Sequence, residues 1–124
     1  MTTRREAREE AFKILFEDEM NEGGAVEHQH EFINELITGV KEHKLEIDKK
    51  IESFLVNWTL QRISLVDKTI LRIALYEIIY IESIPHAVSI NEAVELAHKY
   101  GDEKSSKFIN GILSNIVKEG DVGR

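Results

Sequence analysis

The chain of 124 residues contains no cysteine and only one proline, Pro85. The absence of cysteine excludes disulfides, zinc sites with cysteine ligands and thiol nucleophiles. With a single proline, nearly the whole chain is open to helix, because proline is the residue that helix interiors tolerate least. The longest apolar stretch, residues 70–81, is too short to span a bilayer, and the charged first ten residues lack the apolar segment of a signal peptide. We therefore expect a soluble, cytoplasmic protein with one compact domain.

The sequence also lacks the excess of basic residues that is typical of nucleic-acid-binding proteins, since its net charge is −7. Residues 17–52 account for this imbalance, with eleven acidic and four basic residues. Residues 1–16 carry four bases and three acids, and residues 53–124 carry eight bases and nine acids. A polyanion could bind these two nearly balanced segments, whereas the acidic segment is either a solvated face or a docking site for a basic partner.

Apolar residues recur at helical spacing along the chain, and no strand pattern competes with them. Thr3 and Glu6 form a capping box that opens a first helix, and Ser64 and Asp67 have the same relation at a later helix start. Ser89 and the three residues after it are expected to cap a further, short helix. The expected helices span about residues 3–22, 32–42, 47–58, 64–81, 89–100 and 104–119. The fold class is therefore all-α.

The helix expected at 64–81 is apolar almost all round, so it should be the central, buried one. Glu77 lies inside it, and we interpret this carboxylate as structural, paired to a base or to backbone, rather than as a catalytic acid. Gly39 and Gly111 also lie inside helices, where close helix–helix approach would explain both. For Gly111, the alternative is backbone exposed to a ligand, because Asn110 precedes it.

Two Glu-x-x-His units, Glu27–His30 and Glu95–His98, have the spacing of ligands in di-metal helical bundles. The buried stripe of the second unit's helix should turn Glu95 and His98 toward solvent, and the first unit stands beside a Gly-Gly loop. We therefore expect no metal and no cofactor. No nucleophile elbow or phosphate-binding glycine loop is present either, and an enzyme is not predicted.

Basic and aromatic residues occur together near both ends of the chain. Arg4, Arg5, Arg8 and Phe16 belong to the first helix, with Phe16 three turns beyond Arg5 at nearly the same azimuth. Lys104, Lys107 and Phe108 begin the last helix, whose N-terminal amides also favour an anion. Guanidinium and ammonium groups can hold phosphates while aromatic faces stack on unpaired bases, but the same residues also suit an ordinary helical core and surface.

Four ordered motifs and the first helix together resemble the NusB family of bacterial transcription antitermination factors. The motifs are Trp58–Asp67 (WTLQRISLVD), Ile70–Glu77 (ILRIALYE), Ile90–Ala97 (INEAVELA) and Lys107–Gly111 (KFING), preceded by Arg5–Glu9 (REARE). The resemblance covers nearly the whole chain. It implies about six to seven helices arranged as two packed bundles, an N-terminal one at about 1–58 and a C-terminal one at about 59–120.

The resemblance also implies a function. Family members bind NusE, a small-subunit ribosomal protein, and the pair recognises boxA, a single-stranded RNA element of ribosomal RNA operons, before joining elongating RNA polymerase. The residues that match the family's RNA-binding positions are Arg4, Arg5, Arg8, Phe16, Lys107, Phe108 and Asn110. Asp67 matches an acidic position linked to the surface shared with NusE.

This sequence departs from the family pattern at two of these positions. Phe16 stands where relatives often have tyrosine, so a stacking face remains but a hydroxyl is lost. Lys104 stands where an acidic residue is familiar, and we count it among the expected RNA-binding residues because it could strengthen a phosphate contact.

Three alternatives stay open beside this interpretation. The same helical module forms the front domain of some ribosomal RNA cytosine methyltransferases, but those need an α/β domain and a catalytic cysteine that this chain lacks. A helical adaptor that binds only proteins would keep the fold, and a di-metal enzyme would carry bound metal. The sequence leaves both a monomer and a homodimer open.

Overall fold

The computed structural model describes residues 2–21, 28–56 and 59–119, and these residues form helices without any strand. The elements are α1 (Arg4–Asn21), α2 (Glu31–Glu42), α3 (Lys44–Ser53), a 3-10 helix η1 (Leu60–Arg62), α4 (Leu65–Tyr80), α5 (His86–Tyr100) and α6 (Ser105–Glu119). The predicted all-α class is confirmed. Among these elements, none is both long enough and apolar enough to cross a membrane.

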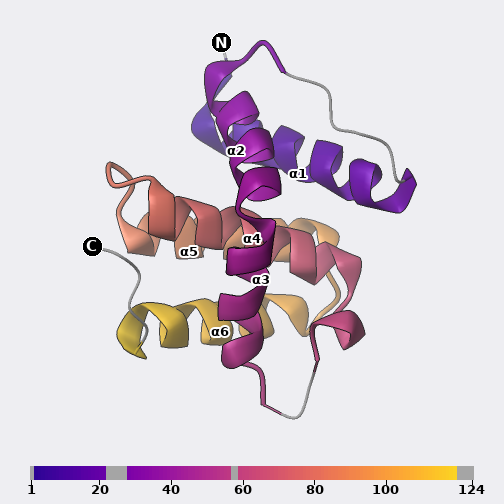
Figure 1. Cartoon of the computed structure of the whole chain (residues 1–124), viewed down its shortest axis with the longest axis vertical. Helices are drawn as coiled ribbons and strands as arrows, with labels where there is room; N and C mark the ends of the chain where they lie inside the picture. The colour runs from indigo at the N-terminus through magenta and orange to yellow at the C-terminus, as the bar shows by residue number, and fades with distance from the viewer. Residues whose placement is uncertain (1, 22–27, 57–58, 120–124) are drawn as a thin grey trace.

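Helix α4 is the centre of the molecule, as its apolar sequence predicted. Every residue from Thr69 to Ile78 is buried, and α4 packs against α1, α2, α3, α5 and α6. Figure 1 shows α1 and α2 at one end of the molecule, α6 at the other, and α4 between them. Because α4 contacts both groups, it joins them into one core. The division into bundles near residue 58 remains a prediction, and Trp58 and Gly120 themselves lie outside the described residues.

Two of the helix starts follow from local hydrogen bonding that the sequence predicted. The amide of Thr3 donates to Glu6 Oε1 at 2.9 Å, and the amide of Glu6 donates to Thr3 Oγ1 at 3.1 Å. At α4, the amide of Asp67 donates to the hydroxyl of Ser64 at 3.1 Å. Both pairs satisfy amides that the first turn of a helix leaves without a partner.

The predicted starts and ends of two other helices are wrong. Helix α5 begins at His86, with Pro85 in the capping position, and not at Ser89. The fixed φ of proline suits the entry to a helix, whereas the hydroxyl of Ser89 is buried and donates to Glu77 Oε1 at 2.8 Å instead of capping. Helix α3 ends at Ser53 rather than near Trp58, because Phe54 leaves the helical conformation.

The two helical glycines have opposite surroundings. A Cβ atom at Gly39 would lie 2.2 Å from the ring of Tyr76, so the predicted close approach is confirmed there. A Cβ atom at Gly111 would meet nothing within 4 Å, and the packing interpretation of Gly111 is therefore wrong. Gly111 instead leaves an open stretch of backbone on the exposed side of α6.

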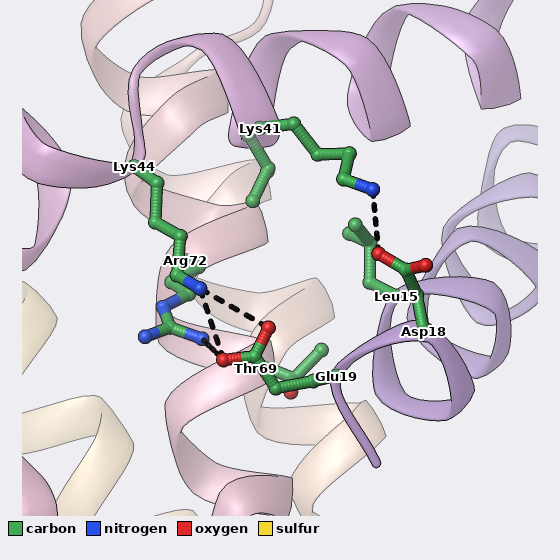
Figure 2. A pocket seen from close by; sticks show the side chains of 8 residues that line it. Leu15, Asp18, Glu19, Lys41, Lys44, Thr69 and Arg72 are labelled. Atoms are coloured by element: carbon green, nitrogen blue, oxygen red, sulfur yellow. Dashed lines mark hydrogen bonds and ion pairs between the residues drawn. The ribbon is translucent and has the colours of Figure 1, made fainter. Parts of the chain in front are cut away.

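Part of the acidic segment joins helices of the same chain. Figure 2 shows the end of α1 facing the start of α3 and the middle of α4 across a small hollow. Lys44 Nζ donates to Glu19 Oε1 at 2.9 Å, and Arg72 Nη1 lies 3.6 Å from the same oxygen. Lys41 pairs with Asp18 beside them. These acids are therefore neither simply solvated nor free for a basic partner.

Candidate nucleic-acid interface

The exposed arginines of the candidate interface lie in the first turn of α1. The guanidinium of Arg4 lies 4.5 Å from the ring centre of Phe32 in α2, a cation–π distance. Arg5 reaches across to α5, where its Nε and Nη2 donate to the two carboxylate oxygens of Glu92 at 3.1 and 2.9 Å. These hydrogen bonds and the charge of Glu92 raise the pKa of Arg5 above its ordinary value. Arg4 and Arg5 both remain exposed, so a ligand can reach them.

Arg8 lies one turn further along α1, but its side chain is only 5% exposed. Its Nε and Nη2 donate to Glu77 Oε2 and Oε1 at 2.7 and 2.9 Å, and Ser89 donates to Glu77 as well. A buried carboxylate needs such partners, so the structural interpretation of Glu77 is confirmed. Arg8 therefore has a structural role and exposes little of its side chain, and its contact with RNA stays a prediction.

The second group of candidates lies at the start of α6. Lys104, Lys107 and Asn110 are exposed, and Phe108 is half-buried against the core. The carboxylate of Asp102 accepts a hydrogen bond from the amide of Lys104 at 2.8 Å. Asp102 therefore already occupies part of the helix N-terminus that was predicted to favour an anion. The lysine side chains remain available for phosphates.

A surface hollow brings Asp67 together with this group. It has a volume of about 370 Å³ and joins the start of α4 to the start of α6. Its lining is Arg62, Ile63, Ser64, Asp67, Asp102, Lys104, Ser105 and Phe108. Burial raises the pKa of Asp67, and the nearby charge of Asp102 adds to this effect. Asp67 Oδ1 is buried and has no hydrogen-bond partner among the described residues. Two of the expected RNA-binding residues, Lys104 and Phe108, thus line the same hollow as Asp67, the expected NusE-binding residue.

Phe16 belongs to an aromatic cluster between α1 and the end of α5. Its ring stacks on Phe12 with ring centres 5.8 Å apart, and Phe12 lies 4.9 Å from the ring of Tyr100. Phe16 is only partly buried, so one face can still meet a ligand. Arg5 lies eleven residues earlier on α1, about 16 Å away at the helical rise. The candidate residues are therefore spread along α1 and at the start of α6 rather than forming one compact pocket.

Two residues beside the candidates, Arg62 and Tyr100, were not singled out from the sequence. Arg62 lies in the short η1 helix, where no helical periodicity exists to assign it a face. Tyr100 was interpreted only as the end of a helix, although its ring packs on Phe12 and its hydroxyl donates to Glu9. An aromatic residue directly before the Gly101 turn was the signal that could have identified it.

The Glu-x-x-His units do not form a metal site in the part of the chain that the structure describes, which holds no group of three ligating side chains. Glu95 and His98 are exposed, as predicted. In the other unit, His30 caps α2 by accepting a hydrogen bond from the amide of Ile33 at 3.3 Å. Glu27 lies outside the described residues.

Comparison with known proteins agrees with this geometry. The model of the NusB family matches residues 2–118. The chain belongs to the NusB family. Transcription antitermination protein NusB of Oceanobacillus iheyensis is 48% identical in an alignment of 123 residues that covers 92% of this chain and 98% of that protein. The NusB of Bacillus velezensis is 46% identical in an alignment of 122 residues that covers 91% of this chain and 94% of that protein.

Solved NusB structures share the fold. The structure of T. maritima NusB matches with a TM-score of 0.87 and 38% identity, covering 96% of this chain and 94% of that one. A structure described as antitermination factors NusB and NusE in complex with dsRNA matches with a TM-score of 0.83 and 29% identity, covering 93% and 96%. The predicted family is therefore confirmed, and it is a family of antitermination factors rather than of enzymes.

Proposed function

We propose that this chain is a transcription antitermination factor that binds boxA RNA together with NusE and joins the elongating RNA polymerase complex. The observation that carries the proposal is the similarity, over 92% of the chain, to a protein named transcription antitermination protein NusB. A similar solved structure contains NusB and NusE in complex with dsRNA, which supports NusE and RNA as partners. A protein with these partners works in the cytoplasm.

The geometry supports RNA as a ligand through the surface that α1, α5 and α6 share. Arg4 and Arg5 on α1 and the lysines at the start of α6 are exposed bases, and both helices pack against the core. Phe16, further along α1, and Phe108, at the start of α6, are partly buried, which leaves an aromatic face for an unpaired base. The net charge of −7 does not oppose this assignment, because residues 17–52 carry the excess of acids, whereas residues 1–16 and 53–124, which supply these bases, are nearly balanced.

NusE is assigned to the neighbourhood of Asp67. Asp67 is only partly buried and lines a hollow on the surface, where its carboxylate can accept a hydrogen bond from a partner's donor. Asp67 also lines the same hollow as Lys104 and Phe108, so one partner at Asp67 would lie next to RNA at α6. Ordering a single strand is entropically costly, and a surface shared by two proteins spreads that cost over more contacts.

A pull-down tests the proposal. Tagged chain is incubated with purified NusE, with or without boxA RNA, and the retained NusE and RNA are measured. We expect more NusE to be retained with boxA than without it, or with a scrambled RNA or an RNA duplex in its place. If NusE is retained equally in all cases and no RNA is held, the chain is a protein-binding adaptor and the proposed function is wrong.

A further inference from the structure

The ion pair between Arg5 and Glu92 holds the Arg5 guanidinium in one orientation. Two hydrogen bonds, from Nε and from Nη2, engage both oxygens of the carboxylate. Glu92 is 15% exposed and is fixed on α5, whereas the side chain of Arg5 is 66% exposed. A bidentate contact of this kind fixes the plane of the guanidinium as well as its distance.

The pair leaves the outer edge of Arg5 free. A guanidinium has five N–H donors, and Glu92 takes one on Nε and one on Nη2. Among the described residues, no hydrogen bond from Nη1 of Arg5 is recorded. The remaining edge therefore presents two donors side by side in a fixed plane. That arrangement matches the adjacent O6 and N7 acceptors of guanine, as well as two oxygens of a phosphate.

The charge of Glu92 decides between these two ligands. A carboxylate at 2.9 Å largely cancels the attraction of Arg5 for a distant phosphate, which depends on net charge. Arg5 and Glu92 line a further hollow between α1 and α5. Glu9, Glu95, His98 and Lys99 also line it, with Lys99 already paired to Glu9. Recognition of an uncharged base edge depends on hydrogen-bond geometry, which the ion pair improves.

We propose that Glu92 determines specificity: it positions Arg5 to hydrogen-bond the edge of an unpaired guanine and suppresses sequence-independent attraction to phosphates. This inference rests on the RNA-binding function proposed above and deepens it. Glu92 acts through Arg5, so it is a positioning residue rather than a contact residue.

The test compares affinities for boxA and for a scrambled RNA of the same composition, measured by fluorescence anisotropy with NusE present. Glu92→Gln should bind the scrambled RNA about fivefold more tightly, the effect of one unit charge about 4 Å away in water. For this variant, the slope of log affinity against log salt concentration should become steeper by roughly 0.7, the value of one added phosphate contact on a single strand. Affinity for boxA should rise less, so that the ratio of boxA affinity to scrambled-RNA affinity falls.

Two further variants separate geometry from charge. Glu95→Gln removes a charge from the same hollow without breaking a hydrogen bond to Arg5, so it should lower the ratio of boxA affinity to scrambled-RNA affinity less than Glu92→Gln does. Arg5→Lys keeps the charge but lacks the planar fork, so it should lower the ratio as Glu92→Gln does. Thermal melts establish that each variant is folded.

The outcomes distinguish this inference from the proposed function. If Glu92→Gln changes both affinities by the same factor, or Arg5→Lys keeps the ratio, Glu92 acts only as a charge and the inference is overturned. If the parent protein with NusE does not prefer boxA to the scrambled RNA, the proposed function itself fails.

Discussion

At the scale of single residues, neighbours in sequence have opposite roles. Arg5 and Arg8 are both arginines of α1, yet one is exposed beside Glu92 and the other is buried against Glu77. Sequence reasoning singled out Arg8 as a phosphate ligand and Glu77 as a structural carboxylate without pairing them. The two residues are 69 positions apart, and only the packing of α1 on α4 brings them together.

Replacement of Arg8 tests its structural role. Arg8→Ala should lower the free energy of unfolding by about 3 kcal/mol, because it leaves Glu77 charged, buried and without its base. Urea denaturation measures this change. The double variant with Arg8→Met and Glu77→Leu should recover most of the loss, since a buried ion pair can often be replaced by apolar side chains. If Arg8→Ala is as stable as the parent but binds RNA weakly, Arg8 is an RNA ligand after all.

The two helical glycines give a matched pair of stability predictions. Gly111→Ala should stabilise the protein by about 1 kcal/mol, the difference in helix propensity at an open position. Gly39→Ala should destabilise it by roughly 1–3 kcal/mol, because its Cβ would overlap the ring of Tyr76. Thermal melts of the two variants should therefore shift in opposite directions. Equal shifts would contradict the surroundings described for these glycines.

At the scale of elements, helix existence was predictable and helix ends were less so. Periodicity identified each helix, and hydrogen-bonded caps at Thr3 and Ser64 fixed two starts. The start of α5 was mispredicted because Ser89 looks like a cap in sequence, whereas its hydroxyl is needed by buried Glu77. The residues around Ser89 do not indicate that Glu77, twelve positions earlier, will be buried and will accept a hydrogen bond from the Ser89 hydroxyl.

The ion pairs between helices predict a dependence of stability on pH. The hydrogen bond from Lys44 lowers the pKa of Glu19 below its ordinary value of 4.5. The stabilisation that Glu19 provides is therefore complete above about that value and is lost as pH falls through the lowered pKa. Glu19→Gln should destabilise the protein by about 0.5 kcal/mol at pH 7, a small value because the carboxylate is 38% exposed and screened by solvent.

The same comparison at pH 3 completes this prediction. The difference between the parent and Glu19→Gln should become smaller there, because protonation has begun to remove the charge from the parent as well. Glu17→Gln, an exposed position on α1, is the control and should change stability little at either pH. A Glu19→Gln difference that stays constant from pH 7 to pH 3 would show that the charge is not what joins α1 to α3 and α4.

At the scale of the whole molecule, the motifs predicted the family, and the family predicted which residues face RNA. The structure adds what ordered motifs cannot contain: the hollow that brings Asp67 next to Lys104 and Phe108, and the place of Tyr100 beside Phe12. Both depend on the packing of α4, α5 and α6 in three dimensions. The central claim that follows is that the exposed lysines at the start of α6 contact the RNA backbone.

The salt dependence of boxA binding tests this claim most directly. Lys104→Ala and Lys107→Ala, each with NusE present, should weaken binding to boxA. The slope of log affinity against log salt concentration should become shallower by roughly 0.7 per lost phosphate contact. Lys118→Ala, an exposed lysine at the other end of α6, should change neither quantity. If the Lys104 and Lys107 variants match Lys118→Ala in affinity and slope, the start of α6 does not contact the RNA and the account is contradicted.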